Sequence, residues 1–193
     1  MKTIKENISN ELVIKNSKFI TLLYKLNTNN IDNIMSEVKE LYPKATHYCY
    51  AYIYNNYKKS SDDGEPTGTA GAPIMNVLEK EQLNNILVVV VRYFGGIKLG
   101  AGGLIRAYTK AVTEALKQAL YQELISGYKV QIDFDYSQEK QLNYLLNDSI
   151  IIEKKYDEKI TYLALIDKQV LDKLHGYDYQ ILEELYIEKS INC

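Results

Sequence analysis

The sequence predicts an α+β protein of two domains, residues 1–127 and 128–193, and three observations support this fold class. The run ILVVVVRYF at 86–94 is almost unbroken in its apolar character, which is typical of a strand buried on both faces. Amphipathic segments with helical spacing flank this run. From residue 128 onward, short strands and helices follow in the order βαββαβ, the order of a ferredoxin-like split βαβ module.

The first domain shows clear periodicity. Apolar residues recur at three-four spacing in 31–42 until Pro43, whereas 47–54 alternates between two faces. Pro73 falls in the first turn of a short helix, where its missing N–H costs nothing. The expected elements are a strand at 18–26, a helix at 31–42, a strand at 47–54, a polar loop at 55–68, a helix at 72–80, a strand at 86–94 and a long helix from 102 or 103 to about 120.

The second domain is predicted from shorter patterns. Ser137 can cap one helix, and Gly176 can end another. The expected elements are strands at 128–134, 150–156, 159–166 and 182–189, with helices at 137–146 and 167–174.

Composition and charge exclude several classes of protein. The chain carries a net charge of −2, with 15 Lys/Arg against 12 Asp/Glu in residues 1–127 and 8 against 13 in residues 128–193. Neither part is basic enough for a nonspecific nucleic-acid binder, so an anion site must be local. No apolar run reaches the ~18 residues of a membrane span, and the N-terminus does not resemble a signal peptide. Two cysteines suggest reduced thiols, so we expect a cytoplasmic protein without a membrane partner.

Eight of the ten glycines lie in two segments, SDDGEPTGTAGAP at 61–73 and RYFGGIKLGAGGLIRAY at 92–108. The second segment fails the Walker A template, which requires the sequence Gly-Lys-Ser or Gly-Lys-Thr. Here Lys98 follows Ile97 and is followed by Leu99 and Gly100. It also fails the dinucleotide fingerprint, because Gly100 and Gly102 would require a third glycine where Ile105 stands.

A looser anion-binding hypothesis survives for this segment. The long helix begins there, and its unpaired first-turn N–H groups, together with nearby cations, can attract an anion. The candidate residues are Arg92, Lys98, Gly100, Gly102, Gly103 and Arg106. The alternative is that the glycines are present only because they can adopt positive φ angles and allow close packing of the helix against the strand.

The acidic segment supplies a second set of candidates: Asp62, Asp63, Glu65 and Thr69. It can be a simple turn built on Gly64 and Pro66. Alternatively, its carboxylates can pair with Arg92, Lys98 or Arg106 and position them, or hold a hard cation. The spacing is not that of a calcium loop.

The remaining reactive side chains favour structural roles. Cys49 lies in the middle of a predicted strand, so a buried thiol is favoured over a nucleophile paired with His47. His175 lies at a helix end, and two histidines with one central cysteine do not make a zinc site, so no catalytic or metal-ligating residue is assigned. The tyrosines at 48–54 can form a stacking platform for bases, but we favour packing under a helix.

Three stretches together resemble the IMPACT family, including its bacterial, YigZ-type members: SKFI at 17–20, SDDGEPTGTAGAPIMNVL at 61–78 and NNILVVVVRYFGGIKLGAGGLIRAY at 84–108. The resemblance extends from Ser17 to about Leu120. It implies a ribosomal protein S5 domain 2-like N-terminal domain and a ferredoxin-like C-terminal domain similar to the last domain of translocation elongation factors.

The resemblance also implies a translation-linked regulatory or nucleic-acid-binding role, with RNA, the ribosome or a translation-associated protein as partner. We therefore expect a non-enzymatic protein without a cofactor. The alternative is a Mg²⁺-dependent enzyme acting on a phosphate- or nucleotide-containing substrate, with the carboxylates of 62–65 holding the metal.

Overall fold

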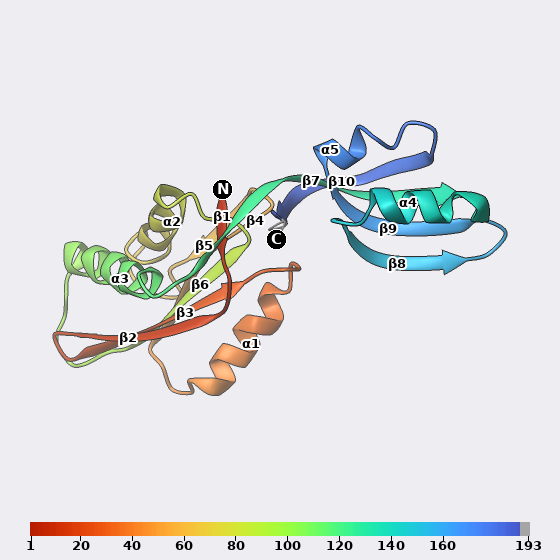
Figure 1. Ribbon diagram of the computed structural model, residues 1–193. Coiled ribbons are helices and arrows are strands. Elements are labelled where there is room, and N and C mark those ends of the chain that lie inside the picture. Colours follow the sequence, from red (N-terminus) through yellow and green to blue (C-terminus); the bar gives the residue numbers. More distant parts are fainter. Residues whose placement is uncertain (190–193) are drawn as a thin grey trace. The chain divides into compact units, whose positions relative to one another are not determined.

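The computed structural model describes residues 1–189 and divides into two compact units, Met1–Gln122 and Glu123–Cys193 (Figure 1). Its mixed α/β composition, with two sheets, agrees with the predicted class. Residue 127, where the sequence places the domain boundary, lies inside a continuous strand, β7 (Tyr121–Phe134).

The first unit is built on an antiparallel sheet with the strand order β2-β3-β6-β4-β5. The strands are β2 (Ile8–Ile14), β3 (Ser17–Lys25), β4 (His47–Tyr54), β5 (Tyr57–Ser61) and β6 (Ile86–Tyr93). The apolar run forms the central strand β6, and every residue of it from Ile86 to Arg92 is buried. Burial on both faces explains why this strand is apolar without alternation.

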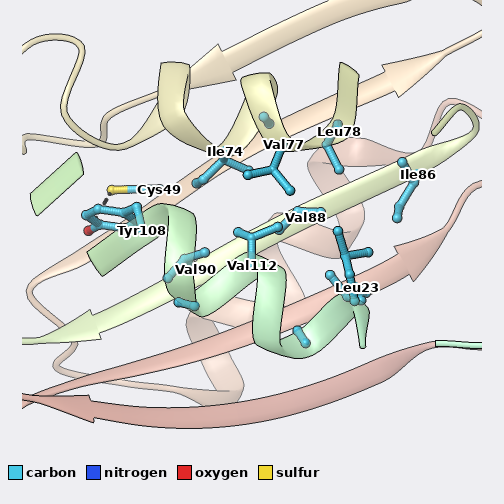
Figure 2. Close-up of a cluster of buried hydrophobic side chains, with 14 of the residues drawn as sticks. Leu23, Cys49, Ile74, Val77, Leu78, Ile86, Val88, Val90, Tyr108 and Val112 are labelled. Atoms are coloured by element: carbon cyan, nitrogen blue, oxygen red, sulfur yellow. Dashed lines mark hydrogen bonds between the residues drawn. The ribbon is translucent and has the colours of Figure 1, made fainter. Parts of the chain in front are cut away.

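Helices cover both faces of this sheet (Figure 1). On one face, α1 (Ile31–Leu41) packs against Leu87, Val89 and Val91 of β6. On the other, α2 (Gly71–Lys80) and α3 (Ala101–Leu116) pack against Ile86, Val88 and Val90 (Figure 2). The long helix thus begins and ends somewhat earlier than predicted.

The tyrosine row of β4 lies on the α1 side of the sheet. Tyr52 is buried, and its neighbours Tyr48, Tyr50 and Tyr54 are partly buried against the same apolar cluster. The arrangement agrees with packing under a helix rather than with an open platform for bases.

The structure corrects the sequence prediction at several strands. Residues 55–68 are not all loop, because they contain β5, which pairs with β4. The register runs from Tyr50 opposite Ser61 to Tyr54 opposite Tyr57. The N-terminal residues, which received no element, form β1 (Lys2–Ile4) and β2. The strand β5 was missed because it is a polar, exposed edge strand with little apolar signal. The strand β2 does alternate, with Ile8, Leu12 and Ile14 packed against the core, but the sequence prediction assigned no element there.

The second unit has the element order β-α-β-β-α-β. After β7 come a short 3₁₀ turn (Tyr136–Gln138), α4 (Glu139–Leu145), β8 (Ile150–Tyr156), β9 (Ile160–Asp167), α5 (Lys168–Leu171) and β10 (Asp178–Glu188). The strands of this unit lie in the order β10-β7-β9-β8. Within residues 1–189, no helix is both long and apolar enough to cross a membrane.

Candidate functional site

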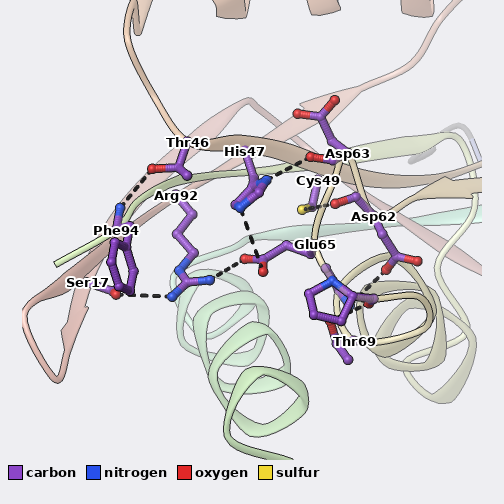
Figure 3. A network of polar contacts seen from close by, with 12 residues as sticks. Ser17, Thr46, His47, Cys49, Asp62, Asp63, Glu65, Thr69, Arg92 and Phe94 are labelled. Atoms are coloured by element: carbon purple, nitrogen blue, oxygen red, sulfur yellow. Dashed lines mark hydrogen bonds and ion pairs between the residues drawn. The ribbon is translucent and has the colours of Figure 1, made fainter. Parts of the chain in front are cut away.

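Residues from both glycine-rich segments meet at one end of the first sheet, on the side covered by α2 and α3 (Figure 3). The antiparallel register pairs His47 of β4 with Arg92 of β6. The loop after β5 brings Glu65 between them, so that residues far apart in the sequence make direct contact. We call this group the Glu65 network; its members are Ser17, His47, Cys49, Glu65, Arg92 and Tyr108.

Glu65 is the centre of the network. Its side chain is buried and forms an ion pair with the equally buried Arg92. The hydroxyl of Tyr108 donates a hydrogen bond to the same carboxylate oxygen at 2.8 Å. Burial of a carboxylate is costly unless it is paired and hydrogen-bonded, and both conditions are met here. The network is therefore a structural unit in which the loss of one partner leaves another charge uncompensated.

Arg92 is held from several directions. One guanidinium nitrogen contacts Glu65, and the other lies 3.3 Å from the hydroxyl of Ser17. The guanidinium also lies over the rings of Phe19 and Phe94, at 5.4 and 5.7 Å from their centroids. With 4% of its surface exposed, Arg92 is not part of an exposed cationic surface, contrary to one form of the anion-binding hypothesis.

Cys49 and Tyr108 extend the network into the core. The Cys49 sulfur lies 2.9 Å from the backbone carbonyl of Asp62 and 3.2 Å from the Tyr108 hydroxyl. Burial raises the pKa of Cys49 to about 12, and it also raises the pKa of Tyr108. The protonated thiol is a poor nucleophile at neutral pH, which agrees with the structural role expected for Cys49.

His47 lies at the outer edge of the network. Its Nε2 is 3.8 Å from a Glu65 carboxylate oxygen, and its Nδ1 contacts the backbone carbonyl of Asp63 at 2.8 Å. Asp63 in turn accepts the backbone N–H of Tyr48 at 2.6 Å. These contacts fasten the acidic loop to the first residues of β4.

The Asp62 side chain forms hydrogen bonds with backbone N–H groups. Its carboxylate accepts the N–H groups of Gly68, Ala70 and Gly71 at 2.8, 3.0 and 2.8 Å. Burial acts to raise the pKa of Asp62, but these three donors outweigh it and hold the pKa below its ordinary value. Asp62 thus caps the start of α2. Nearby, the hydroxyl of buried Thr69 donates to the Pro66 carbonyl at 2.6 Å.

Lys98 and Arg106 remain exposed, and neither forms an ion pair within residues 1–189. The acidic segment therefore positions Arg92 but not these two cations. Helix α3 starts directly between them. It has Gly100 as its N-cap, no side-chain cap and no acidic residue in its first turn, so its first N–H groups carry no competing side-chain acceptor.

The glycines of this segment have distinct roles. A Cβ on Gly95 would lie 2.1 Å from the backbone of Asn16, so this glycine is required for close packing. Gly96 and Gly100 have φ angles of 85° and 71°, which favour glycine, and have open space around them. A Cβ on Gly102 would meet only the tip of Arg106 at 3.6 Å, and one on Gly103 would lie 3.1 Å from Leu99. Packing alone does not account for Gly102.

Residues 1–189 give little support for a metal centre. No group of three or more His, Cys, Asp and Glu side chains there is arranged to hold a metal ion. The carboxylates of Asp62 and Glu65 are already occupied by backbone N–H groups and by Arg92.

Sequence reasoning left several contributors out of the site, chiefly Ser17, His47 and Tyr108. Their contacts depend on the pairing of β3, β4 and β6, which a local pattern does not reveal. A usable signal existed for Tyr108: it lies on the apolar stripe of α3, where a phenolic hydroxyl, once buried, requires a polar partner.

Comparison with known proteins extends these observations. The family model described as the Impact N-terminal domain matches residues 15–116. The IMPACT family member YvyE of Bacillus subtilis is 34% identical over 205 residues, covering 98% of this chain and 94% of that protein. The IMPACT family member YigZ of Escherichia coli is 37% identical over 153 residues, covering 74% of each. A crystal structure of a hypothetical protein aligns with a TM-score of 0.72 and 28% identity, covering 94% of this chain and 97% of its own.

Proposed function

Because the chain belongs to the IMPACT family and is of its bacterial, YigZ-type branch, we propose that it is a translation-linked regulatory protein that binds RNA, the ribosome or a translation-associated protein. We place the contact on the surface formed by Lys98, Arg106 and the first turn of α3 with Gly100, Gly102 and Gly103, and call it the basic surface. The translation link comes from the family resemblance, and a cytoplasmic location follows from the same proposal.

The observation that carries the location of the contact is the contrast between the three cations of the segment. Arg92 is neutralised by Glu65 in the interior, whereas Lys98 and Arg106 stay exposed beside an uncapped helix start. Exposed cations and free N–H groups are the features that bind phosphate or carboxylate groups. The Tyr108 hydroxyl joins α3 to the Glu65 network, so we infer that the network helps to position this helix.

The alternative of a Mg²⁺-dependent enzyme receives less support. It needs carboxylates that are free to coordinate a hard cation. Asp62 instead accepts three backbone N–H groups, and Glu65 is paired with Arg92. These contacts favour a binding function over catalysis.

We also propose fold assignments for the two units: ribosomal protein S5 domain 2-like for the first and ferredoxin-like for the second. The second assignment is supported by the element order β-α-β-β-α-β and the strand order β10-β7-β9-β8. The first rests on the family resemblance.

Co-sedimentation tests the proposed function. The purified protein is centrifuged with ribosomes and, separately, with protein-free ribosomal RNA. We expect pelleting with ribosomes that weakens as salt is raised, because phosphate contacts release counterions. Pelleting with RNA alone would identify RNA as the partner, and pelleting only with intact ribosomes would identify a ribosome-associated protein. No pelleting in either case would contradict the proposal.

A further inference from the structure

An exposed aromatic ring, Phe94, lies beside Arg92 at the edge of the Glu65 network (Figure 3). Phe94 is 46% exposed although it follows the buried strand β6. The guanidinium of Arg92 lies over its ring, and the hydroxyl of Thr46 accepts its backbone N–H at 2.9 Å. The backbone of Phe94 is therefore tied to Thr46 and one side of its ring contacts Arg92, while nearly half of the residue is exposed to solvent.

Two loops are fastened beside Phe94. The turn between β2 and β3 lies against Gly95, where the backbone of Asn16 leaves no room for a Cβ. The loop between α1 and β4 is tied by Thr46, whose N–H donates to the Arg92 carbonyl at 2.8 Å. A further bond joins this loop to β6, since the Tyr93 hydroxyl lies 3.3 Å from the Pro43 carbonyl.

Three lysines lie on the segments around Phe94, two of them in these loops and one in the segment between β6 and α3. Lys15 precedes Asn16 in its turn, Lys44 follows Pro43, and Lys98 lies four residues after Phe94. A residue spans at most about 3.6 Å of chain, so the Cα of Lys98 lies within roughly 15 Å of the Phe94 Cα. Lys15 and Lys44 lie one and two residues from Asn16 and Thr46, which contact Gly95 and Phe94. All three are exposed, and up to residue 189 none of them has an ion-pair partner. Lys18, by contrast, is paired with Glu11.

We propose that this Phe94 surface, made of Phe94, Lys15, Lys44 and Lys98, binds single-stranded RNA, with an unpaired base stacked on the ring and phosphates contacted by the lysines. The inference rests on the proposed function and specifies its partner and its contact. An aromatic ring held rigidly among cations is the arrangement used for single strands, because every base offers a planar face while the phosphates supply the charge. An acidic peptide would satisfy the lysines but has no need of a stacking ring.

Fluorescence anisotropy with a labelled oligouridylate tests the proposal. Base stacking contributes about 1–3 kcal/mol per base, so Phe94→Ala should weaken binding roughly 5- to 150-fold, whereas Phe94→Tyr should bind like the wild type. Phe94→Leu, which keeps an apolar side chain, should resemble the alanine variant. Unfolding curves of all three check that the fold is intact.

The charge arm of the experiment uses a salt series. Each phosphate contact contributes about 0.7 to the slope of log K against log salt for single strands. The triple variant Lys15→Ala/Lys44→Ala/Lys98→Ala should therefore lower the magnitude of that slope by about 2. The matched control removes three exposed lysines elsewhere on the first unit: Lys5, Lys59 and Lys80. The control should leave the slope near that of the wild type.

The outcomes separate this inference from the proposed function. Equal affinity of Phe94→Ala and Phe94→Tyr for RNA would overturn the stacking contact while leaving a translation-linked RNA binder in place. Ribosome pelleting without any oligouridylate binding, or displacement only by an acidic peptide, would overturn the RNA partner but not the proposed function. Failure of both assays would overturn both.

Discussion

Glu65 and Arg92, 27 residues apart in the sequence, form a buried ion pair that fastens the acidic loop to the end of the central strand. The pair separates the residues of the two glycine-rich segments into two groups. Those around Glu65 are buried and paired with one another, whereas Lys98 and Arg106 are exposed and are the residues that we propose contact a partner. Substitutions in the first group should change the stability of the fold, and substitutions in the second should change partner binding, so the two can be measured independently.

Breaking the ion pair should be more harmful than replacing it. Glu65→Ala leaves the Arg92 guanidinium buried without a counter-charge, which costs about 3–5 kcal/mol of unfolding free energy. The double variant Glu65→Leu/Arg92→Met removes both charges and should recover much of that loss. Urea unfolding measures both. A single variant as stable as the wild type would show that the pair does not hold the loop.

The Asp62 carboxylate should stabilise the start of α2. Asp62→Ala removes the acceptor of three backbone N–H groups, and helix caps contribute about 0.5–2 kcal/mol each. The pKa of Asp62 is lowered on folding, so its contribution is present above the ordinary value of 3.8 and is lost as pH falls through the lower folded pKa. Unfolding curves between neutral and acid pH test this prediction. Glu40→Ala, on the exposed side of α1, is the control and should change little.

Cys49 should be unreactive in the folded protein. In a Cys193→Ser background, it is the only thiol and should react with a disulfide reagent at neutral pH only as fast as the protein unfolds. Rapid stoichiometric labelling under native conditions would contradict the buried position.

The Cys49 thiol also predicts a pH dependence of stability. Its pKa rises from 9.0 to about 12 on folding, so the unfolded chain loses this proton first. Stability should therefore fall as pH rises from about 9 toward 12, by up to about 1.4 kcal/mol per pH unit from this group. Because other groups titrate in the same range, the measurement is the difference between the wild type and Cys49→Ala. Identical pH profiles would refute the assignment.

The glycines should differ in their tolerance of a methyl group. Gly95→Ala places a Cβ 2.1 Å from the Asn16 backbone and should destabilise the fold by about 1–3 kcal/mol or more. Gly102→Ala meets only the flexible end of Arg106 and should be close to neutral for stability. Thermal unfolding compares the two. Equal effects would mean that the glycine turn does not pack as described.

Much of the fold could be predicted because its signals are local. The apolar run of β6, the stripe of α3 and the alternation of β4 each report burial directly through periodicity. The strand β5 was missed because it is a polar edge strand that depends on pairing with β4. The strand β2 alternates over Ile8, Leu12 and Ile14, so its signal was present in the sequence but was not used.

The candidate site was harder to predict than the fold. The acidic segment was correctly expected as one possible partner of Arg92, but the choice of Glu65 over Asp62 or Asp63 depends on loop geometry. Lys15 and Lys44 gave no signal at all, since only the contacts of Asn16 and Thr46 place their turns beside Phe94.

The central claim is that the exposed basic surface, and not the buried network, contacts the partner. Its most direct test is ribosome co-sedimentation of Lys98→Ala/Arg106→Ala beside the charge-matched control Lys59→Ala/Lys80→Ala over a series of salt concentrations. We predict that the first variant binds more weakly and with a shallower salt dependence while its unfolding free energy stays unchanged, and that the control behaves like the wild type. Equal binding by the two variants at every salt concentration would contradict the account.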